Sequence, residues 1–442
     1  MTEPGWVQHA VWWQVYPLGF VGAEQQSLAP DEDSRHRLAA LTPWLDYLQE
    51  LGASGLLLGP VFESATHGYD TIDFRRIDRR LGDEADFAGL VSAAHERGIR
   101  VMLDGVFNHV GRDFPVFQAA LKEGADSAAA QWFRMSWPLT GTAEPDYDHF
   151  EGHRQLVTLN HANPEVADFV VEVMCHWLDR GADAWRLDAA YAVPAEFWAQ
   201  VLPRVRERHP DAYIVGEVIH GDYAGYVAAS GIDSVTQYEL WKAIWSSLND
   251  RNLYELDWTL SRHNAQLEQF APLTFVGNHD VTRIASKLTD DRLVAHALVL
   301  LFTLGGTPSI YAGDEQGFRG IKEDREGGDD AIRPAFPADP GELSALGRPL
   351  FVLHQELIGM RRRHPWLHRA QAHVEHLANE QLVYTVRSGQ DSLVVALNLA
   401  DGPVTVPAPQ ATGVLCGEAV LTSPGASASV ELPARGWVVL TA

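Results

Sequence analysis

Apolar residues along most of this chain alternate between short continuous runs and longer stretches with helical spacing. The stretches at 83–98 and 164–181 begin with an acidic turn or a proline and end in glycine, as amphipathic helices do. Eight short runs predict buried strands at 11–18, 55–60, 100–107, 183–189, 212–218, 234–238, 273–279 and 308–314. Eight strands that alternate with helices predict parallel βα units, and eight such units close a barrel.

Two regions depart from this rhythm. About fifty residues between 110 and 163 show little periodicity, and so long a connection inside a compact domain usually has a function. After about residue 370, short apolar runs at 381–388, 392–400, 404–409, 417–423 and 437–442 alternate with glycine, proline and an Asp-Gly pair, which is typical of antiparallel strands. We therefore predict an α/β fold, a (β/α)8 barrel (1–109 and 161–368) with a B subdomain inserted after strand three (110–160) and a C-terminal antiparallel β-sandwich (369–442).

Composition narrows the range of partners. The chain has 442 residues and a net charge of −25, from 34 Lys and Arg against 59 Asp and Glu. Such an acidic surface repels nucleic acid and anionic membranes, so neutral or cationic partners are favoured. Two distant cysteines argue against a disulfide framework and exclude a cysteine-ligated zinc site. Without an apolar run of about 18 residues or a signal-like start, we expect no membrane span and a cytoplasmic protein.

Polar side chains follow several predicted strands where each strand ends. They are Asp104 and His109 around strand three, Arg186 and Asp188 in strand four, Glu217 after strand five, and His279 and Asp280 after strand seven. A single carboxylate at a strand end is usually a helix cap or a salt-bridge partner. Several at equivalent heights on separate strands are hard to explain by chance, and in a barrel the C-terminal strand ends build the active site.

Carboxylates together with aromatic residues favour sugar chemistry. Glycosidic cleavage needs one carboxylic acid to protonate the leaving oxygen and one carboxylate to attack or to position water. Aromatic rings such as that of Tyr69 are candidates to stack on sugar faces. Metal-assisted hydrolysis is the alternative interpretation of the histidines and acids. It is less favoured because the chain has no HExxH or HxH pair and its two histidines lie on separate loops.

Four motifs resemble, in order and spacing, the signature regions of the α-amylase family, glycoside hydrolase family 13. They are DGVFNH (104–109), GADAWRLDAA (181–190), GEV (216–218) and FVGNHD (275–280). Further segments extend the resemblance over roughly residues 10–370: QVYP (14–17), GYDTIDF (68–74), LVTLNHANPEV (156–166) and IYAGDEQG (310–317). The chain looks most similar to the neopullulanase, cyclomaltodextrinase and maltogenic amylase group.

The resemblance implies a role for each strand-end residue. Asp188 would be the nucleophile, Glu217 the general acid/base, and Asp280 a third carboxylate that grips and distorts the sugar. Arg186 would keep Asp188 ionised, and Asp104 would support Arg186 rather than touch substrate. Tyr69 would stack under the sugar, and His109 and His279 would hydrogen-bond to it.

Local departures narrow the expected substrate. Thr66 and His67 precede the stacking tyrosine where oligo-1,6-glucosidases usually carry a pocket-closing aspartate, so the pocket is expected to continue to further glucose units. Ala189 after the nucleophile favours α-1,4 bonds, since α-1,6 preference tends to accompany a valine. Ile219 and His220 stand where the group usually has a tryptophan two residues after the acid/base, which alters the acceptor side of the site.

We therefore expect a retaining hydrolase of α-1,4 bonds in short maltooligosaccharides or cyclodextrins. The alternatives are a transglycosylase or a sugar isomerase with the same machinery and, more remotely, a non-catalytic amylase-like binding subunit. We predict no cofactor and no required calcium, because the stretch 189–194 does not match the family's calcium-binding pattern beside Asn108. With strand one near residue 11, the group's extra N-terminal domain is not expected, which favours a monomer or a weak homodimer.

Overall fold

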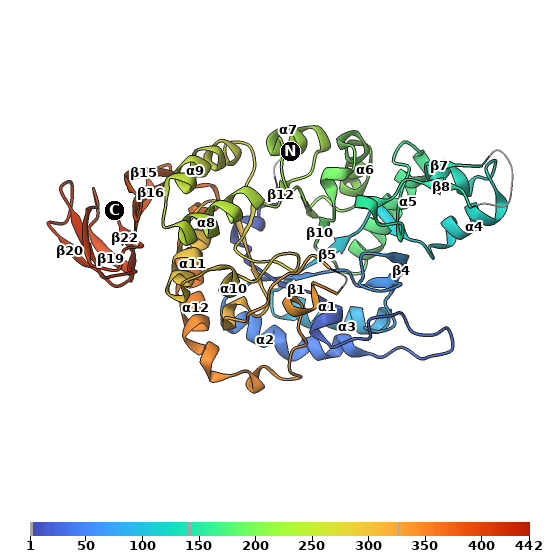
Figure 1. The fold of residues 1–442 in the computed structure, drawn as a ribbon, viewed down its shortest axis with the longest axis horizontal. Helices are drawn as coiled ribbons and strands as arrows, with labels where there is room; N and C mark the ends of the chain where they lie inside the picture. Colours follow the sequence, from blue (N-terminus) through green and yellow to red (C-terminus); the bar gives the residue numbers. More distant parts are fainter. Residues whose placement is uncertain (1–2, 139–143, 326) are drawn as a thin grey trace.

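The computed structural model describes residues 3–138, 144–325 and 327–442. Its centre is an eight-stranded parallel sheet with the strand order β12-β11-β10-β5-β2-β1-β14-β13 (Figure 1). The strands are β1 (Trp12–Val15), β2 (Gly55–Leu58), β5 (Arg100–Gly105), β10 (Ala184–Leu187), β11 (Tyr213–Gly216), β12 (Ser234–Val235), β13 (Leu273–Phe275) and β14 (Thr307–Tyr311). A parallel bridge between Thr236 and Leu273 joins the two outer strands, so the sheet closes into the predicted barrel.

The barrel strands are shorter than the apolar runs that predict them. The run 11–18 contains β1 only to Val15, because Pro17 begins a short helix, α1 (Pro17–Phe20). The run 234–238 contains β12 only to Val235, and Tyr238 begins the helix α8 (Tyr238–Asp250). Most barrel-strand residues are buried, as expected for strands covered on both faces.

Helices surround the barrel, and the two that periodicity predicts most clearly are present. Asp83 caps α3 (Glu84–Glu96) with a capping box to Asp86, and Asn163 caps α5 (Pro164–Leu178). The other long helices are α2 (Thr42–Leu51), α6 (Ala195–Arg208), α7 (Tyr223–Ser230), α9 (Tyr254–Leu267), α11 (Val294–Thr303) and α12 (Arg348–Arg363). Within the described ranges, no helix has both the length and the apolar character that a membrane span requires.

The connection between β5 and α5 forms a small insertion beside the barrel. It contains α4 (Pro115–Glu123) and the two-stranded pair β7 (Met135–Ser136) and β8 (Asp146–Tyr147). Its two ends pair with each other as β6 (His109–Gly111) and β9 (Leu156–Thr158), so the chain leaves and returns at one place. Another hairpin, β3 (Phe62–Ser64) and β4 (Thr71–Ile77), follows β2 and carries Tyr69 in its turn.

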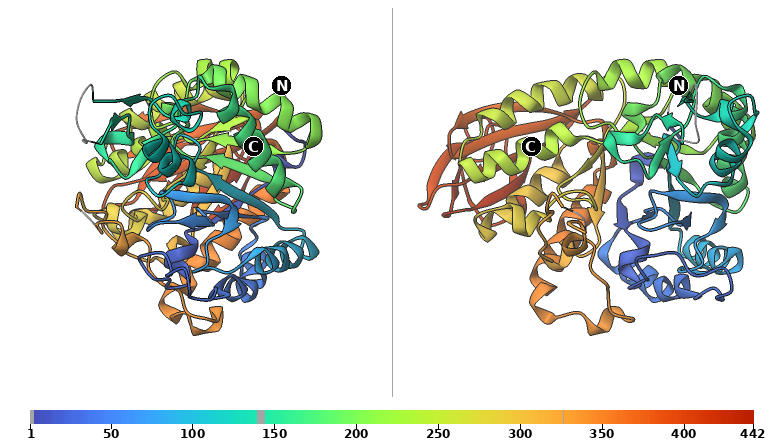
Figure 2. Two further views of the ribbon diagram at one scale, coloured as in Figure 1. Left: turned by 90° about the vertical axis from the view of Figure 1, so that its right-hand side faces the viewer. Right: turned by 45° about the vertical axis from the view of Figure 1, so that its right-hand side comes forward.

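The C-terminal strands form a separate two-sheet unit. Figures 1 and 2 show it at the end of the molecule opposite α4, β7 and β8. One sheet has the order β15-β16-β17-β22-β19 and the other β18-β21-β20. The sequence predicted the strands β16 (Gln381–Ser388), β17 (Asp391–Asn398), β18 (Val404–Pro407), β20 (Val420–Thr422) and β22 (Trp437–Thr441), and missed β15 (Gln371–Ala378), β19 (Gly413–Gly417) and β21 (Ser429–Leu432). The missed strands are short or partly exposed, so their apolar pattern is weak.

A buried carboxyl lies beside the barrel just after β14. Glu315 accepts hydrogen bonds from the Tyr47 hydroxyl at 2.8 Å and from the Gly313 N–H at 3.0 Å. None of the ion pairs between described residues includes it, and burial raises its pKa to about 7. Because the folded state binds this proton more tightly than the unfolded state, its contribution to stability is present below about pH 4.5 and is lost as pH rises through 7.

We predict that Glu315→Gln makes the protein less sensitive to alkaline pH. Between pH 4.5 and 8, the free energy of unfolding of the wild type should fall by about 3 kcal/mol relative to that of the variant, since glutamine carries no proton to lose. Thermal unfolding at several pH values measures this, with the exposed Glu342→Gln as the control. Parallel pH profiles for wild type and Glu315→Gln would contradict the prediction.

Candidate active site

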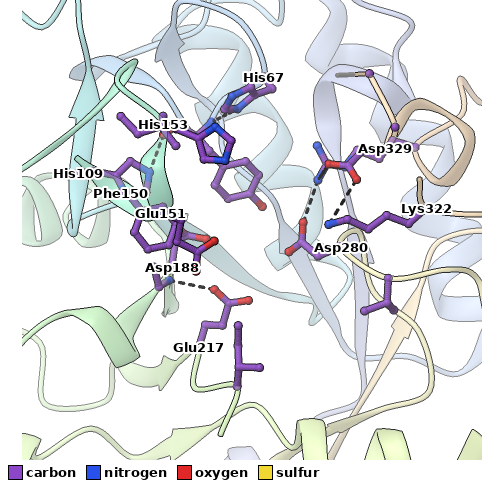
Figure 3. A pocket seen from close by; sticks show the side chains of 18 of the residues that line it. His67, His109, Phe150, Glu151, His153, Asp188, Glu217, Asp280, Lys322 and Asp329 are labelled. Carbon is purple, nitrogen blue, oxygen red and sulfur yellow. Dashed lines mark hydrogen bonds and ion pairs between the residues drawn. The ribbon is translucent and has the colours of Figure 1, made fainter. Parts of the chain in front are cut away.

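One cavity of about 470 Å³ is lined by four of the predicted strand-end residues, His109, Asp188, Glu217 and Asp280. Asp104, Arg186 and His279 do not line it, but each contacts a residue that does. Asp104 lies in β5 and Arg186 in β10, while Asp188 and Glu217 directly follow β10 and β11. Asp280 comes from the loop after β13. Figure 3 shows Asp188 and Glu217 on one side of the cavity and Asp280 on the other.

Arg186 contacts the two carboxyls on the Asp188 and Glu217 side of the cavity. Its Nη1 contacts both oxygens of Asp104, at 2.6 and 2.7 Å, and Oδ1 of Asp188 at 3.2 Å. Its Nη2 lies 2.8 Å from Oε1 of Glu217. A guanidinium that is only 2% exposed is thus surrounded by three carboxyls from three neighbouring strands. Removal from water is costly for each of these charges, and their mutual contacts offset that cost.

Glu217 is held by two further donors. The Ala189 N–H donates to its Oε2 at 2.9 Å, and the Tyr238 hydroxyl donates to its Oε1 at 3.1 Å. Ala189 has a left-handed backbone with φ of 46°, which is unfavourable for alanine and is kept here in a tightly packed turn. Asn278 in turn donates to the Tyr238 hydroxyl at 3.0 Å.

The Asp188 and Glu217 carboxyls share a buried site. Burial and then the negative charge of Glu217 raise the pKa of Asp188 well above its usual range, and Arg186 acts in the opposite direction. The negative charge of Glu217 thus opposes the ionisation of Asp188, and the positive charge of Arg186 favours it.

The other side of the cavity carries an ionised carboxylate. Although burial raises the pKa of Asp280, His279 and then Arg333 lower it well below its usual range. Nε2 of His279 lies 2.8 Å from one oxygen of Asp280, and Arg333 contacts the other at 2.8 Å. Gln14 in β1 is hydrogen-bonded at 2.9 Å to the remaining ring nitrogen of His279.

Tyr69 and His109 also line the cavity. The Tyr69 ring lies parallel to that of His279, and its hydroxyl donates to Asp104 at 3.1 Å. Nε2 of His109 donates to the Tyr69 carbonyl at 3.1 Å, and burial lowers the pKa of His109 to about 3. His109 is therefore neutral at pH 7, and its ring stacks on Phe150 of the insertion between β5 and α5.

Three of the five residues at which the sequence departs from related enzymes lie at different places. His67 lines the cavity, and its Nδ1 accepts from the Tyr69 N–H at 3.2 Å. Ile219 also lines the cavity and is 38% exposed. His220 is not among the lining residues; its ring lies 6.4 Å from that of Tyr191.

Several lining residues were missed by sequence reasoning. Glu151 and His153 line the cavity from the insertion between β5 and α5, as Figure 3 shows. The Tyr191 hydroxyl donates to Glu151 at 2.7 Å. Asp329 and Arg333 line it from the loop after β14 and form an ion pair at 2.9 Å. Both residues lie in an irregular segment, whose pattern carries no signal of where the loop lies.

Asn108, the residue that the calcium expectation concerns, has one unpartnered side-chain atom. Its Oδ1 is buried and accepts no hydrogen bond from the described residues, while its Nδ2 is hydrogen-bonded to His109. Among the described residues, the group of three acidic or histidine ligands close enough to share an ion is His36, Asp83 and Asp86, which lies at the start of α3 and does not include Asn108. Calcium prefers six or more oxygen ligands.

A closed parallel barrel with two buried carboxyls around one arginine defines a barrel glycosidase. The catalytic domain described as "Alpha amylase, catalytic domain" matches residues 14–383. A cyclomaltodextrinase of Geobacillus thermopakistaniensis is 31% identical, over 99% of this chain and 77% of that protein. Neopullulanase 2 of Thermoactinomyces vulgaris is 32% identical, over 90% and 70% of the two chains. The native debranching enzyme of Nostoc punctiforme superimposes over the full length of both chains with a TM-score of 0.85 and 28% identity.

This chain belongs to the α-amylase family. The match covers most of the chain, which confirms the resemblance that the four motifs carry and the barrel fold that it implies. As a member of that family, the protein is a glycosidase.

We predict that Asp104→Asn destabilises the fold by about 3 kcal/mol, because it takes a charge from a buried ion cluster and leaves an amide among donors. The matched control is Asp46→Asn, which breaks a contact of the same 2.6 Å length between Arg97 and a largely exposed aspartate. Thermal unfolding of both variants measures the difference, and the control should change little. Equal shifts in Tm for the two variants would contradict the assignment of Asp104 as the support of Arg186.

Proposed function

We propose that this protein hydrolyses α-1,4-glucosidic bonds in short maltooligosaccharides or cyclodextrins with retention of configuration. The observation that carries this proposal is the pair of buried carboxyls, Asp188 and Glu217, around the guanidinium of Arg186. Retaining glycosidases need their two carboxyls close together, whereas inverting enzymes leave room for a water between them. Two carboxyls that contact the terminal nitrogens of one guanidinium have the close arrangement.

In the proposed reaction, Asp188 attacks the anomeric carbon and Glu217 gives its proton to the departing glycosidic oxygen. The bond from Asp188 to the sugar forms as the bond to the leaving sugar breaks. Glu217, now a carboxylate, then takes a proton from water, and the resulting hydroxide equivalent replaces Asp188 at the same carbon. Two inversions at one carbon restore the α configuration.

The remaining residues hold the sugar. Asp280, kept ionised by His279 and Arg333, accepts hydrogen bonds from hydroxyl groups of the sugar at the cleavage point. Tyr69 stacks against that sugar, and His279 and the neutral His109 contact its hydroxyls. Arg186 orients Asp188, and Asp104 neutralises Arg186 without touching substrate.

The names of the relatives favour α-glucans as the substrate class. Cyclomaltodextrinase and neopullulanase are names of enzymes that act on α-glucans, and the structural neighbour is named a debranching enzyme. Ala189, which lines the cavity next to Asp188, favours α-1,4 bonds. Transfer of the glycosyl unit to a sugar, or isomerisation, needs the same intermediate and stays the alternative; the non-catalytic binding subunit conflicts with the intact carboxyls.

Cytoplasmic location, a monomer or weak homodimer, and independence of calcium stay predictions. The last of these rests on the stretch 189–194, which does not match the pattern of calcium-binding relatives. No step of the proposed reaction needs a metal or a cofactor.

We predict that maltotetraose and γ-cyclodextrin yield early α-anomeric maltose or glucose. Proton NMR in the first minutes separates the α from the β anomer before mutarotation equalises them. Products longer than the substrate supplied, or new linkage signals, would instead assign the protein to the transferases, and early β-anomeric product would contradict the retaining reaction.

We predict that azide separates the roles of the two carboxyls. Asp188→Gly, supplied with an activated α-maltosyl fluoride and azide, should form the β-azide, because azide enters from the face that the aspartate occupied. Glu217→Ala should form the α-azide from the same reagents, since azide attacks the covalent intermediate. Both products are identified by NMR. Reversed stereochemistry in the two variants would exchange the proposed roles.

A further inference from the structure

A second cavity of about 330 Å³ lies beside the active site, between the helices α8 and α9. We call it the α8–α9 groove and define it by Ile219, Tyr238, Trp241 and Trp258, with the ion pairs Glu239–Arg262 and Lys242–Glu255 at its rim. Figure 1 shows α8 and α9 side by side, next to β12. None of the roles proposed above uses Trp241, Trp258 or the rim.

The groove has an aromatic surface that solvent reaches. The Trp258 side chain is 62% exposed, which is unusual for so large an apolar group. The Arg262 guanidinium lies over the Trp258 ring, 4.7 Å from its centre, and so holds the indole in one orientation. Trp241 is half-buried and packs edge-to-face on Tyr238. An oriented indole with one face free is a stacking surface for the C–H face of a sugar ring.

The charges around the groove neutralise each other. Arg262 pairs with Glu239, and Lys242 pairs with Glu255, which also accepts from Ser246 at 2.7 Å. Each pair joins α8 to α9, so the rim presents donors and acceptors without a net charge. Such a rim suits hydroxyl groups of a neutral ligand and offers no unpaired charge to an ionic one.

The groove continues from the active-site cavity on its Glu217 side. Ile219 and Tyr238 line both cavities. Ile219 comes two residues after Glu217, and the Tyr238 hydroxyl donates to Glu217. In the proposed reaction Glu217 protonates the departing oxygen, so the departing part of the substrate lies on this side.

We propose that the α8–α9 groove binds the departing, acceptor-side glucose units of a longer α-glucan chain, with Trp258 as their stacking platform. This inference rests on the proposed function and deepens it, because it makes the enzyme sensitive to chain length. A short substrate occupies only the first cavity. A longer one also reaches Trp258 and binds more tightly, and a bound acceptor sugar there favours transfer over hydrolysis.

The test compares maltoheptaose with maltotriose in wild type and in Trp258→Ala. The variant should lower kcat/KM for maltoheptaose roughly three- to tenfold and leave maltotriose nearly unchanged, as expected for loss of one aromatic contact. Trp258→Phe should retain part of the preference. Tyr254→Ala is the matched control, since Tyr254 is an exposed aromatic on the same helix and lies outside the groove. Calorimetric titration of maltoheptaose into Asp188→Asn, with and without Trp258→Ala, measures binding without turnover and should show the same weakening.

Three results would overturn the inference. If the ratio of kcat/KM for maltoheptaose to that for maltotriose is unchanged in Trp258→Ala, with an active wild type, the groove does not bind substrate and the proposed function stands. An altered oligomeric mass with an unchanged ratio assigns the exposed indole to a contact between copies of the chain. A wild type that cleaves neither sugar removes the proposed function, and the groove falls with it.

Discussion

The site depends on one buried cation, the Arg186 guanidinium. It lies at the end of β10 with almost no exposure to water, so carboxylates have to compensate it. Parallel pairing supplies them: Asp104 of β5 is in register with Arg186, and Leu187 is in register with Gly216, the residue before Glu217. Any slip between these strands would turn the side chains to the other face and leave a buried charge unpaired. The ion cluster that serves the proposed chemistry therefore also constrains the barrel register.

The two sides of the cavity are built by different means. Asp188 and Glu217 follow adjacent strands, and their spacing is decided within the barrel. Asp280 lies on the opposite side and is positioned by side chains from distant segments, with His279 oriented by Gln14 of β1 and Arg333 reaching in from the loop after β14. Burial and the negative charge of Glu217 raise the pKa of Asp188, whereas His279 and Arg333 lower that of Asp280, so neighbouring charges shift two buried carboxyls of one cavity in opposite directions.

The acceptor side shows how helices extend a barrel site. The resemblance predicts an aromatic residue two positions after Glu217, and the chain has Ile219 there. An aromatic surface is nonetheless present next to Ile219, supplied by Trp241 and Trp258 from the helices that follow β12. The two cavities share Ile219 and Tyr238, and the Tyr238 hydroxyl donates to Glu217, so the first residue of α8 belongs to the surroundings of Glu217.

The sequence by itself determined the barrel and the strand-end residues. Eight apolar runs with helices between them allow few other folds, and charged residues at the ends of buried strands stand out because burial makes them costly. The two-sheet unit was visible where strands are strongly apolar and invisible at β15, β19 and β21. Tertiary structure alone decided which loops meet the cavity. Glu151, Asp329 and Arg333 lie in irregular segments, where no period links sequence position to direction, and Tyr238 and Trp258 became neighbours of Glu217 and Ile219 only through the packing of α8 and α9.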